Sequence, residues 1–174
     1  MRKIRIAGLI LLVVSFLILT SCERMRYDVG EGFEIYLTET PYAARYDIDY
    51  AKISFDTIAL QSTPILRYSD LVKYDTLDHT LTLRISHDSL RIGEAGVYGR
   101  MFVVTIDRQP VYCGFKWSVN SSVGCQWVFI EEPYEVLDNL ADNEIVISCC
   151  STVNPDPRRN RRIMDRLKAD RKIE

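Results

Sequence analysis

The sequence predicts an α+β fold, built mainly on an antiparallel sheet with one or two short helices. Short runs of β-branched and aromatic residues recur between turn-forming residues, which is typical of strands. Helical periodicity is confined to short stretches of the chain. Because 174 residues suffice for one domain with a sizeable core, we expect a single α+β domain at 33–150.

The chain begins with a segment that is typical of an exported protein. A basic head within the first five residues precedes an uncharged run from 6 to 21, which is short for a permanent membrane helix. The run ends in Leu-Thr-Ser-Cys, which resembles the lipobox of bacterial lipoproteins. The resemblance implies that residues 1–21 are a signal peptide and that Cys22 carries the lipid anchor.

The residues after the anchor indicate where the domain lies. Gly30 and Gly32 loosen the end of a short polar segment, so we expect 22–32 to form a tether. The segment lacks the acidic run that resembles a surface-export tag in some lipoproteins. We therefore expect a domain of the cell envelope that is anchored to the membrane and faces the periplasm.

The first half of the domain contains two predicted strands, a longer stretch of strand character and two short helical segments. Residues 33–37 and 79–85 alternate in polarity as strands do, and 50–66 is rich in β-branched and aromatic residues. Residues 69–75 could form one helical turn opened by a capping serine or aspartate. Residues 86–92 are predicted to be a short helix with Ser86 as its N-cap.

The second half begins with the strongest local signal, a predicted hairpin. The apolar run 101–106 is joined to 111–117 by a turn at Asp107-Arg108, so both strands are expected to be largely buried. Further strands are predicted at 126–130 and 144–148, with a turn of helix near 136–140.

Residues 151–174 form a basic tail that is predicted to be helical or disordered. Asp156 and Pro157 are good start signals for a helix, but its apolar face is thin, so we expect the tail to add little to the core. Residues 158–174 contain eight Lys and Arg and three acidic residues, which leaves the preceding domain acidic. An acidic domain gives no support to nucleic-acid binding.

Besides the anchor cysteine, the chain has four cysteines, which allow three complete pairings. Cys113 and Cys125 flank a short connection between two predicted strands, so we expect them to form a disulfide in an oxidising compartment. Cys149 and Cys150 can each pair elsewhere, or one can be buried and the other free. The sequence has neither a Cys-x-x-Cys motif nor clustered histidines, so no metal site and no cofactor are predicted.

Part of the chain resembles a known family. Residues 63–66, 69–71, 79–92 and 102–107, with the turn into 110–112, resemble the head subdomain of the first periplasmic domain of the SecDF protein-export subunits. The resemblance covers about 70 residues at the level of pattern and implies a fold and a location, but no translocase role.

A second resemblance covers the stretch from Tyr112 to Cys125. It is similar to the signature of a group of small uncharacterised envelope lipoproteins with aromatic residues, a pair of serines and a final cysteine. The chain departs from the SecDF pattern at Arg108, where that family has a turn glycine. Neither resemblance implies an activity.

The same stretch supplies the candidate binding residues. A surface for a glycan or an envelope protein could be formed by aromatic residues and the serine pair of the loop that joins them: Tyr112, Phe115, Trp117, Ser121, Ser122 and Trp127. The aromatic residues have an alternative interpretation as core, because rings on central strands bury large apolar areas.

Two other patterns concern modification and catalysis. Thr57, Thr76 and Ser89 follow an aspartate and precede an aliphatic residue, which resembles the motif of general O-glycosylation in some Gram-negative envelopes. His87-Asp88-Ser89 has the residue types of a hydrolase, but the side chains of adjacent residues diverge, so we predict no catalytic residue there. The sequence therefore favours a non-catalytic binding module, with an inhibitor of a secreted hydrolase or an envelope hydrolase as alternatives.

Overall fold

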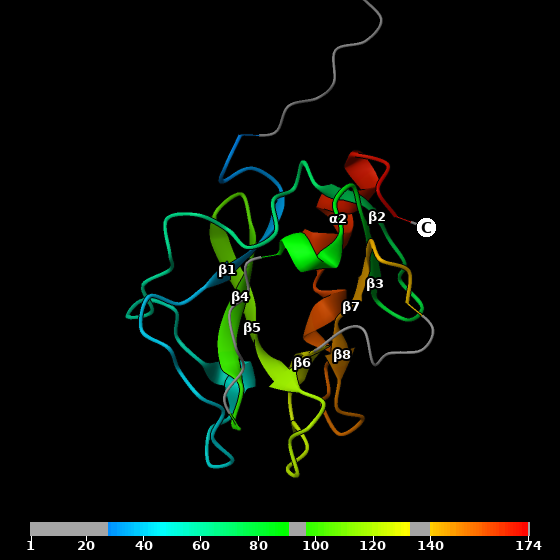
Figure 1. Cartoon of the computed structure of the whole chain (residues 1–174). Coiled ribbons are helices and arrows are strands. Elements are labelled where there is room, and N and C mark those ends of the chain that lie inside the picture. The colour runs from blue at the N-terminus through cyan, green and yellow to red at the C-terminus, as the bar shows by residue number, and fades with distance from the viewer. Residues whose placement is uncertain (1–27, 91–96, 133–139, 174) are drawn as a thin grey trace, which may run out of the picture.

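The computed structural model describes residues 28–90, 97–132 and 140–173 (Figure 1). Within these ranges the chain forms two sheets, one α-helix and short 3-10 turns, which is consistent with the α+β class. The larger sheet has the order β1 (Phe33–Leu37), β4 (Arg100–Ile106), β5 (Gln109–Ser118), β6 (Val128–Glu132) and β8 (Ser148–Cys149). The smaller sheet has the order β2 (Leu71–Tyr74), β3 (Thr80–Leu83) and β7 (Glu144–Val146).

The β4–β5 hairpin forms the centre of the larger sheet, as the sequence predicts. Its two-residue turn places Asp107 at a φ of 50° and Arg108 at 63°, the left-handed geometry that matches the twist of hairpin strands. Gly114 faces the ring of Phe102 so closely that a Cβ atom there would lie 2.3 Å from a ring carbon. The hairpin is therefore buried on both faces.

The far side of the hairpin departs from a purely antiparallel sheet. β6 pairs with β5 in parallel, with Phe115 opposite Phe129, and β8 then pairs antiparallel with β6. Lys116 is only 3% exposed and forms an ion pair with Glu132 at this junction. The pairing supplies the counter-charge that a buried ammonium group requires.

Two predictions for the first half of the domain are wrong. Residues 71–74, expected in a helical turn, form strand β2 because they pair with β3, an arrangement that local propensity does not encode. Residues 50–66, expected to have strand character, contain the 3-10 turn η1 (Tyr50–Lys52) and only isolated bridges at Leu60 and Leu66. The predicted helical turn near 136–140 lies outside the described residues.

The prediction of a short helix at 86–92 with Ser86 as its N-cap is confirmed in part. The 3-10 turn η2 (His87–Ser89) begins at Ser86, whose side chain accepts a hydrogen bond from the backbone N–H of Asp88. An oxygen at this position satisfies a backbone donor that has no partner within the turn. The end predicted for this helix falls outside the described residues.

The basic tail packs into the core, so the expectation that it adds little is wrong. After the 3-10 turn η4 (Pro157–Arg159), the helix α2 (Arg161–Ala169) buries Ile163 and Leu167 completely. Beyond the helix, Ile173 forms a bridge with Tyr74 of β2 (Figure 1). These apolar contacts act together with polar ones, such as the ion pair of Arg166 with Asp107 and the hydrogen bond from Tyr68 to Asp170.

Candidate functional site

The four aromatic residues expected at a binding surface lie in the core. Tyr112, Phe115, Trp117 and Trp127 are 4, 0, 3 and 9% exposed, respectively. The ring of Tyr50 covers two of them, with its centroid 5.0 Å from that of Phe115 and 6.0 Å from that of Trp127. The alternative interpretation as core is correct, because β5 is a central strand whose large rings gain most when they are buried.

The two indole nitrogens and the hydroxyl oxygen of Tyr50 have hydrogen-bond partners within the domain, whereas the buried hydroxyl of Tyr112 has none among the residues that the structure describes. The indole nitrogen of Trp117 donates to the carbonyl of Val123 at 2.9 Å, and that of Trp127 donates to the carbonyl of Cys113 at 2.8 Å. The hydroxyl of Tyr50 accepts a hydrogen bond from the backbone N–H of Arg45 at 2.7 Å. The rings are therefore held in fixed orientations.

A cavity of about 260 Å³ opens beside these rings, and we call it the aromatic cavity. Its floor contains Tyr50, Trp117 and Trp127. Its walls come from η1 and the segment before it, from the end of the loop that leads to β6, and from the segment after β8: Ala44, Arg45, Tyr46, Ile48, Asp49, Ala51, Cys125, Gln126, Thr152, Val153, Asn154 and Pro155. Trp117 and Trp127, which the sequence suggested for a binding surface, line this cavity, and no signal in the sequence indicated its other lining residues.

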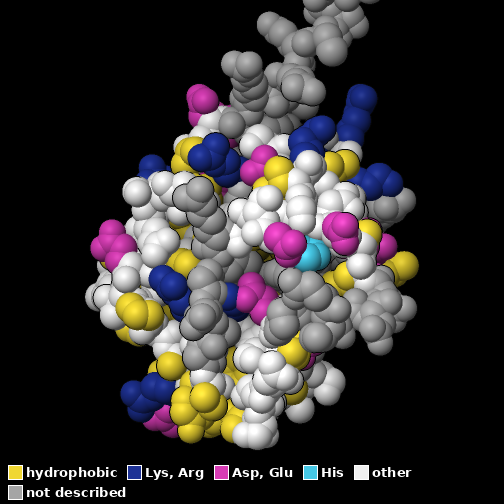
Figure 2. All heavy atoms as spheres, viewed as in Figure 1, with side chains coloured by type: hydrophobic (Ala, Val, Ile, Leu, Met, Phe, Trp, Pro, Cys, Tyr) yellow, Lys and Arg dark blue, Asp and Glu magenta, His cyan; other side chains and the backbone are white. Residues whose placement is uncertain are grey.

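Exposed apolar side chains lie on segments that adjoin this cavity. Figure 2 shows hydrophobic side chains at the lower end of the molecule. Of the seven large hydrophobic residues that are exposed in the described parts of the chain, five come from 42–48 and 97–98. We call these five residues the loop-end patch: Tyr42, Tyr46, Ile48, Val97 and Tyr98, which are 39, 49, 39, 61 and 51% exposed. Tyr46 and Ile48 also line the aromatic cavity, so the patch and the cavity form one surface.

Backbone contacts hold the segments of the patch together. The N–H of Ala44 donates to the carbonyl of Tyr98 at 2.8 Å, and the N–H of Met101 donates to the carbonyl of Tyr42 at 2.9 Å. These pairings continue along the end of β4, so 42–44 lies beside 98–101. Such contacts join parts of the chain more than fifty residues apart, which explains why the sequence did not reveal the patch.

The predicted serines lie at the edge of the patch. The Ser121 hydroxyl is within hydrogen-bond distance of the carbonyl oxygens of Val97, at 3.0 Å, and Val123, at 3.1 Å. Ser122 is exposed. The predicted loop therefore borders the patch, but the exposed aromatic residues of the patch are tyrosines from other segments.

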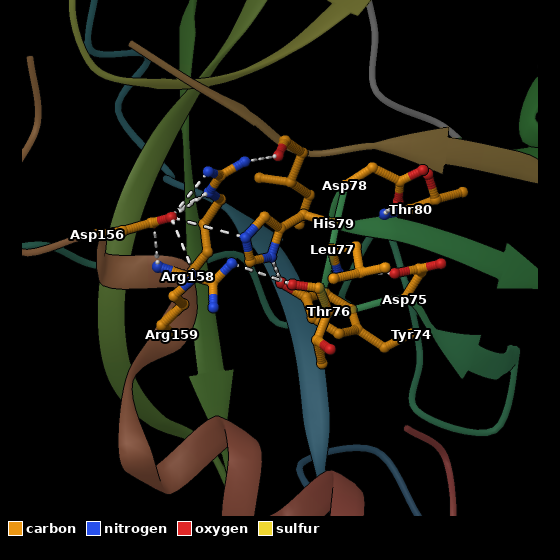
Figure 3. Close-up of polar contacts among 11 residues, drawn as sticks. Tyr74, Asp75, Thr76, Leu77, Asp78, His79, Thr80, Asp156, Arg158 and Arg159 are labelled. Atoms are coloured by element: carbon orange, nitrogen blue, oxygen red, sulfur yellow. Dashed lines mark hydrogen bonds and ion pairs between the residues drawn. The ribbon is translucent and has the colours of Figure 1, made fainter. Parts of the chain in front are cut away.

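A second polar cluster surrounds His79, which is 2% exposed (Figure 3). Its Nδ1 lies 2.6 Å from the hydroxyl of Tyr74, and its Nε2 lies 3.6 Å from a carboxylate oxygen of Asp156. Arg158 in turn donates to Asp156 and to the carbonyl of Ile147. The cluster thus joins the turn before β3 to the segment that leads into α2.

Burial and the charge of Arg158 keep the imidazole of His79 neutral. Burial, followed by the positive charge of Arg158, lowers the pKa of His79 to about 4. Burial opposes ionisation of Asp156, but the hydrogen bonds from Arg158 outweigh it and lower the pKa of this carboxyl. Because the Tyr74 side chain is buried as well, the arrangement serves packing and offers no accessible nucleophile.

The hydrolase-like residue types do not assemble at a cleft. His87 is buried, and its Nδ1 lies 2.9 Å from the carboxylate of its own neighbour, Asp88. Ser89 is exposed to solvent in the same 3-10 turn. His87 and Asp88 thus contact each other, but within the described residues no hydrogen bond joins the Ser89 hydroxyl to the imidazole.

The cysteines that the structure describes all have free thiols, so the predicted Cys113–Cys125 disulfide is not formed in it. Cys113 is fully buried in β5, and burial raises the pKa of its thiol to about 12. Burial also raises the pKa of Cys125 to about 11, with smaller contributions from Cys150 and Cys149. A buried, protonated thiol reacts poorly in disulfide exchange.

The predicted modification sites are partly described. Cys22 and the signal peptide lie outside the described residues. Thr57 and Ser89 are exposed, and Thr76 is half-buried, so the first two hydroxyl groups are accessible on the surface. O-glycosylation at these three residues stays a prediction.

No family model, no curated protein and no solved structure matches this chain. The resemblance to the SecDF head subdomain therefore stays a prediction. Within 28–90, 97–132 and 140–173, none of the helices has the length and hydropathy needed to cross a membrane. The same residues contain no group of three or more His, Cys, Asp or Glu side chains placed to hold a metal ion.

Proposed function

We propose that this protein is a lipid-anchored component of the bacterial cell envelope that acts as a non-catalytic binding module. It is anchored through Cys22, faces the periplasm, and binds a partner protein with the loop-end patch. The observation that carries the proposal is the gathering of five exposed apolar side chains at one end of the domain. Patches of this kind on a soluble domain mark interaction sites.

The position of the patch agrees with an anchor at the N-terminus. The N–H of Gly32 donates to the carboxylate of Asp107, so the chain enters beside the turn at one end of β4. The patch lies at the other end of β4, next to Met101 (Figure 1). Seven residues of extended strand separate the two ends by about 20 Å, so an anchored domain would direct the patch away from the membrane.

The chemistry of the patch favours a protein partner. Three of its five members are tyrosines, which offer a large rigid contact area and a polar tip and are enriched at protein interfaces. The inhibitor alternative needs a loop that protrudes as a wedge. The loop before β6 is tied to the domain through Ser121 to Val97 and through Trp117 to Val123, and none of the large exposed hydrophobic residues of the described chain lies in it.

Site-specific photo-crosslinking in intact cells tests this function. A benzophenone side chain at Tyr46 should give a discrete crosslinked protein, because this residue lies within the patch. The matched control is Leu77, which is 86% exposed in the turn between β2 and β3 and should give none. With the purified partner, Tyr46→Ala should weaken binding by about 2 kcal/mol, or roughly thirtyfold. Equal crosslinking at Tyr46 and Leu77, or adducts with glycan alone, would refute the assignment.

A further inference from the structure

We infer that the aromatic cavity is the socket for one uncharged apolar side chain of the partner protein. This inference rests on the proposed function and names how that surface selects its partner. The cavity of about 260 Å³ receives this side chain, which we call the anchor residue, and the adjoining loop-end patch contacts the rest of the partner surface. Energetically dominant contacts commonly have this form, an apolar side chain in a desolvated pocket surrounded by weaker contacts.

The hydrogen bonding of the floor argues for an apolar occupant. The indole N–H groups of Trp117 and Trp127 already donate to carbonyls of the domain, and the Tyr50 hydroxyl already accepts from Arg45. The floor therefore presents ring surface, and its two indole donors are engaged elsewhere. A sugar would bury several hydroxyl groups, and neither indole N–H of the floor is free to bond them.

The charges at the rim argue for an uncharged occupant. Arg45 makes a bidentate ion pair with Asp47, with distances of 3.0 and 2.6 Å. Asp49 pairs with Lys52 at 2.7 Å. Each charged residue of the cavity wall is thus matched by an opposite charge, and the electrostatic complement of this rim is a neutral group.

The volume argues for a single side chain. Pockets for whole drug-sized ligands span about 300–1,000 Å³, and the aromatic cavity lies below that range. The backbone that carries the anchor residue can contact the amide groups of Gln126 and Asn154, which line the same cavity. Tyr46 and Ile48 flank the opening and continue into the loop-end patch.

The two tryptophans of the chain report on occupancy, because both lie in the cavity floor. The probe is N-acetyl-L-leucinamide, titrated against the folded domain while tryptophan emission is recorded. It should give a saturable change with a dissociation constant on the order of 1 mM, as befits a ligand of about a dozen heavy atoms. N-acetylglucosamine at the same concentrations should give none.

Two matched substitutions of alanine by leucine test whether the probe binds in the cavity. Ala51 is exposed at the surface and lines the cavity, so Ala51→Leu should narrow the socket and weaken the leucinamide at least tenfold. Ala43 is exposed outside the cavity wall, and Ala43→Leu should stay within twofold of the wild type. Thermal unfolding of both variants confirms that each is folded.

The result separates this inference from the proposed function. Crosslinking at Tyr46 without saturable leucinamide binding would refute the socket and leave the interaction module intact. Leucinamide binding without crosslinking would refute the proposed function instead. The socket is also refuted if N-acetylglucosamine binds in place of the leucinamide, or if Ala51→Leu binds the leucinamide as the wild type does.

Discussion

The buried His79 makes the stability of the domain depend on pH in a way that can be calculated. In the folded protein its pKa is lowered from 6.5 to about 4, first by burial and then by the positive charge of Arg158. The unfolded chain therefore binds this proton more readily between these two values. The stabilisation is complete above pH 6.5 and is lost as the pH falls towards 4.

The magnitude follows from the two pKa values. The full difference corresponds to about 3 kcal/mol of unfolding free energy, of which about 2 kcal/mol is lost between pH 7.5 and pH 5. This is a large part of the stability of a small domain. The measurement is urea unfolding at a series of pH values, with the midpoint and the slope fitted at each.

The substitution His79→Asn isolates this contribution. Asparagine does not titrate and tolerates the φ of 64° that the backbone adopts here. The variant should be less stable than the wild type at pH 7.5, because the contact with Tyr74 is lost, but should lose about 2 kcal/mol less on acidification to pH 5. His87→Asn removes the other histidine of the chain and should lose as much stability between pH 7.5 and pH 5 as the wild type does. An unchanged loss in His79→Asn would refute the reasoning.

Three further predictions concern the helix, the hairpin and the anchor. Leu167→Ala should lower the free energy of unfolding by about 2–5 kcal/mol, because it leaves a cavity under α2. Substitution of the exposed neighbour, Lys168→Ala, should change it by no more than about 0.5 kcal/mol, and equal effects of both in denaturant unfolding would contradict the docking of the tail. Gly114→Ala should cost about 1–3 kcal/mol, because the new methyl group meets the Phe102 ring, and an unchanged melting temperature would argue against that contact. Labelled fatty acid should enter the wild type and not Cys22→Ala, and equal labelling of both would end the lipoprotein assignment.

Local sequence patterns were sufficient to predict several elements of the fold. The strand at 33–37 and the hairpin around Asp107 carry enough β-branched and aromatic residues, with a suitable turn, to be recognised without their partners. The cap at Ser86 is equally local, because the donor and the acceptor lie two residues apart. In these cases, the interaction that decides the structure lies within the segment itself.

Other elements depend on partners that are distant in sequence. Residues 71–74 become a strand because β3 lies beside them, and α2 docks because its two buried residues meet a core that earlier parts of the chain build. A thin apolar face seen in sequence does not reveal how deeply it is buried.

The candidate site shows the same division. The sequence by itself identified the loop with Ser121 and Ser122 and the aromatic residues that flank it, because residue type is visible there. Only the tertiary structure decided that the flanking rings are core and that Tyr42, Tyr46 and Tyr98 are the exposed ones. The reason is physical: exposure depends on which segments cover a residue, and backbone bonds such as that from Ala44 to Tyr98 form only in the folded chain.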